Sequence, residues 1–442
     1  MANSVSPKDF KQADRGTGYR AWRGWLSGWL FMLAASWCSA QPLALADLIE
    51  TGMQNHPNLK AGLAAQRAAQ RSLEAAEWQR YPTPSLSIEG VKASGNDTSY
   101  QADDTVTTLR LSQPLYTGGA LTAQIDRAKA QLRIAQANVL EARQQVSLQV
   151  IQSYADWLAA ELKTQAWRRS LVLHEKLLQT AKNRINQGVS SASDLSLVQG
   201  RLDATASEVF SASLQAELAL NRLREQLDMP LPADQLSLQA AAPFTGELHL
   251  DSLLQDAETQ SPALRKIHAQ AGVQRAGTQE REAALLPDIA LRVERQIGHF
   301  SINNTSPENR VFLSVSTKLG AGLSSMSAIA SAKALEDSAE METLSQRRAL
   351  REKIVNAYQL HKSFPERRRL LTSALASSQL ALESFERQFA AGRKSWLDLI
   401  TAARDVAMHE AQIADLKGAE IQTAWHLKTL TASDLADMDT QP

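Results

Sequence analysis

The residues best suited to chemistry are few and scattered along this chain. Histidines lie at positions 56, 174, 249, 268, 299, 361, 409 and 426, with no pair at the spacing of metal ligands on a helix, and Cys38 is the only cysteine. The sequence also lacks a Gly-x-Ser-x-Gly nucleophile motif, a phosphate-binding loop, and a Gly-x-Gly-x-x-Gly motif after a buried strand. We therefore expect no enzyme activity, no metal site and no bound cofactor.

Charge and composition argue against nucleic-acid binding and against a bulky globular core. The 442 residues contain 47 basic and 47 acidic side chains, so the net charge at pH 7 is zero and nothing predicts binding to nucleic acid. The basic run at 366–370 is typical of a solvated helix face. Aromatic residues make up only 5% of the chain, which favours long helices with narrow apolar seams over a bulky globular core.

The N-terminus has the pattern of an export signal. Basic residues precede an apolar segment that ends at Trp37, and small residues around Ala40 offer a cleavage site. Residues 1–40 are therefore the expected signal peptide, with cleavage after Ala46 as an alternative. Two further alternatives are an uncleaved anchor and a lipoprotein acylated at Cys38, although Trp37 stands where lipid attachment requires a small residue. Beyond residue 46 no apolar run is long enough for a transmembrane helix, so any membrane insertion would use strands.

The chain consists of two copies of one unit. A shift of 205 aligns residues 45–59 with 250–264, including Pro57 with Pro262, and a shift of 204 aligns the later parts of the two copies. The expected organisation is a first repeat at 41–228, a connector at 229–248, a second repeat at 249–432 and a tail at 433–442.

Each copy predicts the same order of elements. A first helix ends before a proline, and two short strands with alternating apolar and polar residues follow. A long helix then keeps an apolar seam in 4-3 spacing from Leu121 to Val146, and its roughly seventy residues at about 1.5 Å each would reach about 105 Å. A kink or bulge is expected at Pro365 in the second long helix. The expected elements are first helices at 58–79 and 263–285, hairpins at about 83–115 and 287–318, long helices at about 118–187 and 322–390, and return helices at about 191–228 and 394–432.

Two short motifs mark the ends of the long helices. Near the strands, the sequence Gln-Pro-Leu-Tyr-Thr-Gly-Gly predicts that Pro114 ends the ladder, that Tyr116 lies at the lipid–water boundary, and that Gly118 and Gly119 redirect the backbone. The second copy lacks the proline and the tyrosine at this junction. At the far end, a glycine stops each long helix and an aspartate caps the next, forming a tight hairpin tip. The candidate tip residues are Gly188, Asp194, Leu195, Gly392, Asp398 and Leu399.

The number of strands predicts the quaternary structure. Four strands cannot close into a barrel, and lipid does not tolerate open sheet edges. Outer-membrane barrels have at least about eight strands, so several chains must contribute, and three chains would supply twelve. Together with Asn-His-Pro-Asn-Leu at 55–59, the strand start at 81–90 and the paired tips at 188–195 and 392–399, these features resemble the TolC family of outer-membrane channel-tunnel proteins over residues 45–432.

The resemblance implies a mainly α fold with a small β part. It implies a homotrimer whose twelve-stranded barrel lies in outer-membrane lipid and continues as an α-helical barrel across the periplasm. The tips would form the periplasmic entrance, where a threefold ring of Asp398 would favour cations. The implied partners are a periplasmic adaptor (membrane fusion) protein and an inner-membrane ABC transporter or proton-driven pump.

The implied function is a passive exit duct without enzyme activity. Type I secretion of a large protein, such as an adhesin, is our first hypothesis, because several efflux ducts of the family are lipoproteins and the lipid signal here is poor. The alternatives are a multidrug or metal efflux duct and, from the residues alone, a periplasmic coiled-coil tether.

Overall fold

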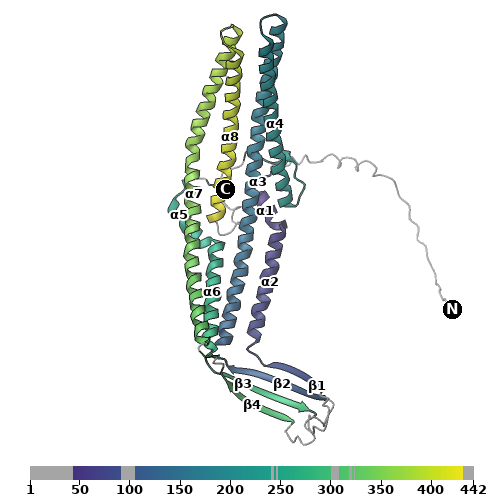
Figure 1. Cartoon of the computed structure of the whole chain (residues 1–442), viewed down its shortest axis with the longest axis vertical. Coiled ribbons are helices and arrows are strands. Elements are labelled where there is room, and N and C mark those ends of the chain that lie inside the picture. The colour runs from purple at the N-terminus through teal and green to yellow at the C-terminus, as the bar shows by residue number, and fades with distance from the viewer. Residues whose placement is uncertain are drawn as a thin grey trace, which may run out of the picture. The chain divides into compact units, whose positions relative to one another are not determined.

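The helices and strands occur in two matching sets along the chain (Figure 1). The computed structural model describes residues 43–90, 105–239, 243–244, 247–299, 308–317, 321–322 and 324–431, and from Pro42 onwards the chain forms one unit. The expected signal peptide and C-terminal tail lie outside these residues, as do most of the two hairpin loops and part of the second strand-to-helix junction.

Corresponding helices of the two sets have identical lengths of 11, 22, 67 and 36 residues, which confirms that the unit is duplicated. The first set is α1 (Leu45–Asn55), α2 (Pro57–Trp78), β1 (Thr83–Gly90), β2 (Thr105–Tyr116), α3 (Ala120–Asn186) and α4 (Ala192–Leu227). The second set is α5 (Leu250–Gln260), α6 (Pro262–Ala283), β3 (Asp288–Ile297), β4 (Asn309–Ser316), α7 (Ser324–Ala390) and α8 (Trp396–Thr431). A short 3-10 helix, η2 (Ala233–Gln235), lies in the connector.

The expectation of one helix before each hairpin is wrong, because each copy has two. α1 stops at His56, whose backbone is extended, since the ring of Pro57 disfavours a helical residue before it. Pro57 then starts α2, where its missing N–H costs nothing, and the Nδ1 of His56 accepts a hydrogen bond from the Asn58 N–H at 3.2 Å. α5 and α6 meet in the same way at Ser261 and Pro262.

The long helix α3 buries the predicted seam over its first half. Ile125, Ala128, Ala135, Val139 and Val146 are buried, which confirms the 4-3 spacing. Ala123, Ala130 and Ala137, which lie off this seam, are also buried, so α3 packs against neighbours on two sides. The corresponding helix α7 continues through Pro365 as one helix, although its 67 residues include this residue without an N–H.

The helices pack side by side in a fixed order. α2 and α4 follow one flank of α3, α6 and α8 follow its other flank, and α7 packs beyond α6 and α8 (Figure 1). Small residues permit the closest approach: a Cβ added to Gly418 of α8 would lie 2.8 Å from the Cβ of Ala159 and 2.9 Å from the carbonyl oxygen of Ala155 in α3. Among the described residues, no helix is both long and apolar enough to cross a membrane.

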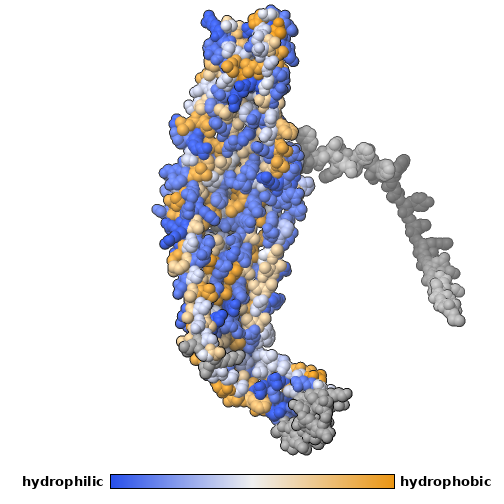
Figure 2. Space-filling model, viewed as in Figure 1, coloured by the Kyte–Doolittle hydropathy of each residue, from blue (hydrophilic) through white to orange (hydrophobic). Residues whose placement is uncertain are grey.

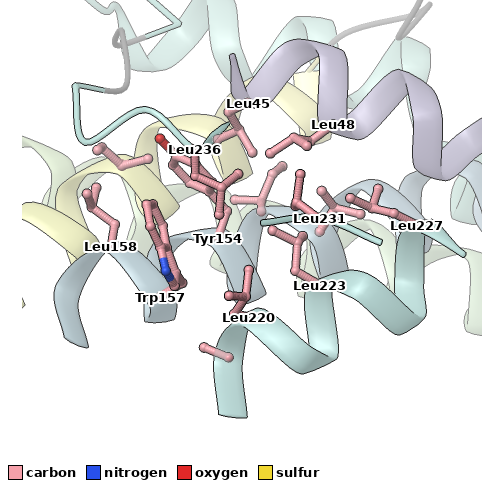
Figure 3. Packing of buried hydrophobic residues seen from close by; sticks show 14 of the residues in the cluster. Leu45, Leu48, Tyr154, Trp157, Leu158, Leu220, Leu223, Leu227, Leu231 and Leu236 are labelled. Atoms are coloured by element: carbon pink, nitrogen blue, oxygen red, sulfur yellow. The ribbon is translucent and has the colours of Figure 1, made fainter. Parts of the chain in front are cut away.

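The largest apolar core lies where α1, α3, α4, α8 and the connector meet. Figure 3 shows Tyr154 and Trp157 of α3 beside leucines of α1, α4 and the connector. Tyr154 is fully buried, and its hydroxyl donates a hydrogen bond to the carbonyl oxygen of Ser237 at 2.6 Å. Burial raises the pKa of this hydroxyl to about 12. The bond ties the connector to the middle of α3.

The four strands form one antiparallel sheet in the order β1-β2-β3-β4. Both hairpins are therefore neighbours, and β2 pairs with β3 across the two copies. The prediction that Pro114 ends the ladder is wrong, because β2 continues to Tyr116. The register shifts between Pro114 and Tyr116, where Tyr116 pairs with Ile289, and such a bulge accommodates a residue that lacks an N–H.

Candidate functional site

One face of the sheet carries mostly exposed apolar side chains, with Arg295 as its one charged residue among the described strand positions. Residues at alternate positions share a face, and the antiparallel register aligns these positions across the four strands. The exposed fraction ranges from 36% for Leu291 to 70% for Val311. Figure 2 shows hydrophobic surface over the strands. The exposed members of this apolar face are Leu86, Ile88, Leu109, Leu111, Leu291, Val293, Ile297, Val311, Leu313 and Val315.

The opposite face of the sheet is polar. Most of the intervening positions carry polar or charged side chains, Val106 and Phe312 are the large apolar ones, and among the described residues of this face only Glu294 is a buried charged residue. Such a two-sided pattern, with apolar side chains exposed in an isolated chain, is typical of strands that face lipid on one side and water on the other.

The junction between β2 and α3 depends on two glycines with positive φ. Gly118 has φ 60° and Gly119 has φ 95°, so both occupy the region that side chains rarely adopt. A Cβ on Gly118 would also lie 2.6 Å from the Cβ of Leu286 and 2.7 Å from the carbonyl oxygen of Ala283. Gly118 is therefore required by the close approach of the α6–β3 connection as well as by its own backbone.

Aromatic side chains gather beside this junction. Tyr116 is 47% exposed. Trp78, the last residue of α2, and Tyr81, just before β1, are more exposed still, with their ring centroids 5.1 Å apart. Of these three aromatic residues, only Tyr116 was expected at the lipid–water boundary from the sequence. The signal for the other two is their position, one helical turn apart, immediately before the first alternating strand.

Both hairpin tips begin with the same backbone motif. Gly188 and Gly392 have φ 74° and 73°, as expected for a glycine that stops a helix. In the first tip, the Gly188 N–H bonds to the carbonyl oxygen of Ile185 and the next N–H bonds to that of Arg184, and the second tip repeats both bonds. The last carbonyls of α3 and α7 are thus satisfied without an extended loop.

The tip aspartates support the caps but are not themselves the capping residues. Ser191 precedes α4, its Oγ accepts from the Asp194 N–H at 3.2 Å, and its own N–H donates to Asp194 Oδ2 at 3.0 Å. Ser395 and Asp398 form the same reciprocal pair. Hydrogen bonds from Ser395, followed by the nearby charge of Lys394, lower the pKa of Asp398. The expectation that each aspartate is the N-cap is therefore wrong; the Ser-x-x-Asp spacing was the available signal.

A small apolar cluster joins the two tips within one chain. Leu399 is buried in it and Leu195 packs against it. The rings of Phe389 and Trp396 lie 4.4 Å apart between centroids, and the indole N–H of Trp396 donates to the Ser190 hydroxyl at 3.4 Å. Trp396 was not among the residues expected at the tips, and its hydrogen-bond partner belongs to the other copy of the repeat. The buried members are Leu177, Ala181, Val198, Phe389, Trp396, Leu399 and Ile400.

An open groove of about 430 Å³ lies beside the second tip, between α7 and α8. Its lining combines apolar Phe385 and Leu397 with the carboxyl groups of Asp398 and Asp405. Lys394 lies over the Phe385 ring, with Nζ 4.3 Å from the centroid. In the described ranges, no three His, Cys, Asp or Glu side chains are grouped so that they could hold a metal ion.

Comparisons with known proteins agree with this geometry. The profile of the family described as outer membrane efflux protein matches residues 48–227 and 253–433, so each copy of the repeat matches separately. Protein CyaE of Bordetella pertussis (strain Tohama I) is 28% identical over 154 residues, which make up 34% of this chain and about a third, 32%, of CyaE.

Several solved outer-membrane proteins have the same fold. The channel OprN superposes with a TM-score of 0.77 at 18% identity, over 88% of this chain and 90% of that chain. VceC of Vibrio cholerae gives 0.75 at 17% identity, over 88% and 96% of the two chains. The open state of the MtrE channel of Neisseria gonorrhoeae gives 0.72 at 18% identity, over 89% and 92%.

These matches confirm the resemblance inferred from the sequence and the mainly α fold with its small sheet. The family consists of transport ducts rather than enzymes, and it resides in the outer membrane and extends into the periplasm. With both repeats matched over most of the chain, this protein belongs to the outer membrane efflux protein family.

Proposed function

We propose that three copies of this chain form a passive exit duct through the outer membrane. The observation that carries the proposal is the sheet, which exposes a mostly apolar face and, among the described residues, has no strand partner outside β1 or β4. A sheet of four strands leaves the backbone N–H and C=O groups of both edge strands without hydrogen-bond partners in lipid. Twelve strands from three copies would close a barrel in which β4 of one copy pairs with β1 of the next.

The helices support the same ring. On the flank of the chain formed by α4, Phe210, Leu214 and Leu218 repeat every fourth residue and are 71%, 44% and 49% exposed. The opposite flank is α7, which also carries large exposed apolar side chains. A contact between different flanks repeats head to tail and closes into a ring when the rotation is right. The exposed apolar residues of α7 are Met326, Leu335, Met341, Leu344, Leu360, Leu370 and Leu380.

The paired tips form the periplasmic entrance in this proposal. Gly188, Asp194 and Leu195 shape one tip, and their counterparts Gly392, Asp398 and Leu399 shape the other. We propose that a periplasmic adaptor docks at the groove between α7 and α8, whose lining is partly apolar and partly acidic. An inner-membrane transporter or pump would supply the energy.

A ring of three Asp398 carboxylates at this entrance would favour cations. The depressed pKa keeps the carboxylate ionised, while Lys394, with Nζ 3.6 Å from Oδ1, offsets part of its charge. Asp398→Asn should lower the ratio of potassium to chloride permeability in planar bilayers. An unchanged ratio would place Asp398 outside the constriction.

Type I secretion is the cargo pathway that we propose first. It is supported by the sequence before Cys38, where Trp37 disfavours lipid attachment, since several efflux ducts of the family are lipoproteins. The second candidate, small-molecule efflux, is favoured by the description of the family profile. Deletion of the gene separates the two. Loss of one large protein from the culture medium with unchanged drug and metal tolerance supports secretion, and the converse supports efflux.

The duct itself is tested by fractionation and mass. The mature chain should partition with outer membranes, and in detergent its mass should equal three chains. Phe210→Glu places a charge on the α4 flank and should reduce the trimer fraction, whereas Gln199→Glu, on the same helix and hydrogen-bonded locally to Asp203, should not. A monodisperse soluble monomer of the wild-type chain would refute the proposal and favour the periplasmic tether.

A further inference from the structure

Three arginines surround one glutamate on the polar face of the sheet. The register pairs Arg110 of β2 with Glu294 of β3, and Glu294 with Arg310 of β4, so these three residues lie in one row across the strands. Arg292 lies two positions before Glu294 on the same face. We call these four residues the arginine belt.

The glutamate lies at the centre of the belt. Its side chain is only 7% exposed, and its carboxylate lies 2.6 Å from Nε of Arg110, 3.1 Å from Nε of Arg292 and 3.9 Å from Nη2 of Arg310. Arg310 also donates to the side-chain oxygen of Gln296. A single carboxylate thus holds three guanidinium groups near one another, although like charges repel at such distances.

The belt carries more positive charge than an internal ion pair needs. One carboxylate neutralises one guanidinium, so a net charge of about two remains on this part of each chain. Among the described residues, Nε of Arg292 and Nε of Arg310 are buried and have no hydrogen-bond acceptor, even though the first lies near the carboxylate. The Arg292 guanidinium lies over the Phe312 ring, with Cζ 4.6 Å from the centroid, so the single carboxylate does not use all the hydrogen-bond donors of the three arginines.

The nearest other charge on the polar face is Glu308, whose carbonyl oxygen accepts from the Gln296 N–H, so that it lies two positions from Arg310. Glu89 of β1 and Asp288 of β3 are each four positions from the nearest row of the belt, or about 13 Å along a strand. That separation exceeds the screening length of about 8 Å at physiological salt. Three arginines against Glu294 and Glu308 leave the belt and its surroundings locally cationic by about one charge, although the whole face carries four acidic and three basic side chains.

We propose that the arginine belt binds oxyanionic groups inside the barrel. The proposal rests on the trimeric duct, in which the apolar face contacts lipid and the polar face lines the lumen. Three copies would bring nine guanidinium groups and three carboxylates into one ring around the passage. Guanidinium forks match carboxylate and phosphate oxygens in pairs of hydrogen bonds, and the side chains of Arg110, Arg292 and Arg310 are 46%, 38% and 29% exposed, so their accessible ends suit polyvalent oxyanions on material that passes through.

The test uses the full mature chain reconstituted in planar bilayers, with inorganic tripolyphosphate added on the barrel side as the probe. Tripolyphosphate should block the wild-type current. Arg292→Gln with Arg310→Gln leaves the close Arg110–Glu294 pair intact and should raise the concentration for half-block about tenfold or more. The matched control is Arg295→Gln, which removes one arginine from β3 on the opposite face and should leave the block unchanged.

Each outcome decides the proposal. If tripolyphosphate does not block the wild-type pore, or blocks the double variant and the wild type equally, the proposed oxyanion binding is wrong, but the proposed duct is unaffected. Equal loss in the Arg295→Gln control would show a nonspecific effect of charge and would also overturn the oxyanion binding. If the wild-type chain forms no pores, both the proposed duct and the oxyanion binding that rests on it are wrong. Should the double variant not assemble, the single variants Arg292→Gln and Arg310→Gln must each weaken the block.

Discussion

Alanine in place of either junction glycine separates backbone conformation from close packing. Gly118→Ala and Gly119→Ala both force a side chain into positive φ, which costs roughly 1–2 kcal/mol. Only at Gly118 does the new Cβ also meet fixed atoms, 2.6 Å from the Cβ of Leu286 and 2.7 Å from the backbone oxygen of Ala283. Among the described residues, nothing lies within 4 Å of a Cβ at Gly119.

The extra cost at Gly118 follows from these two contacts. Neither atom is the end of a flexible side chain, so the backbone itself must shift, and forced overpacking costs typically about 1–3 kcal/mol. Gly118→Ala should therefore lower the free energy of unfolding by about 1–3 kcal/mol more than Gly119→Ala. At about 2 °C per kcal/mol for a large chain, the apparent Tm should differ by about 2–6 °C.

The assay is thermal unfolding of each purified variant in detergent, followed by far-ultraviolet circular dichroism at one scan rate, because unfolding of such a protein is commonly irreversible. Substitutions of Leu286 in the Gly118→Ala background test whether the Leu286 Cβ causes the loss of stability. Leu286→Ala keeps the clashing Cβ and should not rescue Gly118→Ala, whereas Leu286→Gly should rescue it in part. Equal Tm values for Gly118→Ala and Gly119→Ala would refute the reasoning, since they would mean that the α6–β3 connection does not approach Gly118.

Three further predictions use the same measurement. Gly418→Ala should lower the Tm, because overpacking against α3 costs about 1–3 kcal/mol. Gly277→Ala lies in a helix interior with open space among the described residues and should raise the free energy of unfolding by about 0.5–1 kcal/mol. A change of Tm in the same direction for both variants would contradict this prediction. Tyr154→Phe removes the hydrogen bond to the Ser237 carbonyl and should cost about 1–2 kcal/mol, and a neutral result would show that the connector is not held there. Burial, followed by the charge of a nearby lysine, lowers the pKa of His426 from its ordinary 6.5, so the unfolded chain binds the proton first and stability is lost as the pH falls below 6.5. His426→Gln should flatten the fall in Tm between pH 7.5 and 5.5, and an unchanged slope would rule out this histidine as its cause.

Periodicity made most of the helices and strands predictable. The seam ending at Val146 and the alternating strands each repeat a local pattern, and local patterns survive in any tertiary context that buries one face. The helices α1 and α5 were missed although the buried Leu45, Leu48 and Ile49 follow helical spacing, because a proline just after them ends the pattern. Each of these helices has only 11 residues, too few for a helical period to stand out from the surrounding sequence.

The site was predictable only in its local parts. The helix-stopping glycines at the tips depend on φ alone, and their positive values follow from the type of turn. The hydrogen bonds that Asp398 exchanges with Ser395 at the start of α8 could have been predicted from the sequence, because Ser395 precedes it by three residues. The role of Trp396 was not predictable, because the serine that accepts its indole N–H lies 206 residues away in the other copy of the repeat.

The sequence by itself determined the duplication, the helix and strand periods and the positions of the turns, because these depend on neighbours within a few residues along the chain. Only the tertiary structure decided that Pro114 sits in a bulge, that Gly118 has no room for a Cβ, and that three arginines from three strands share one glutamate. Each of these depends on the register and approach of segments that are distant in sequence, which no local pattern specifies.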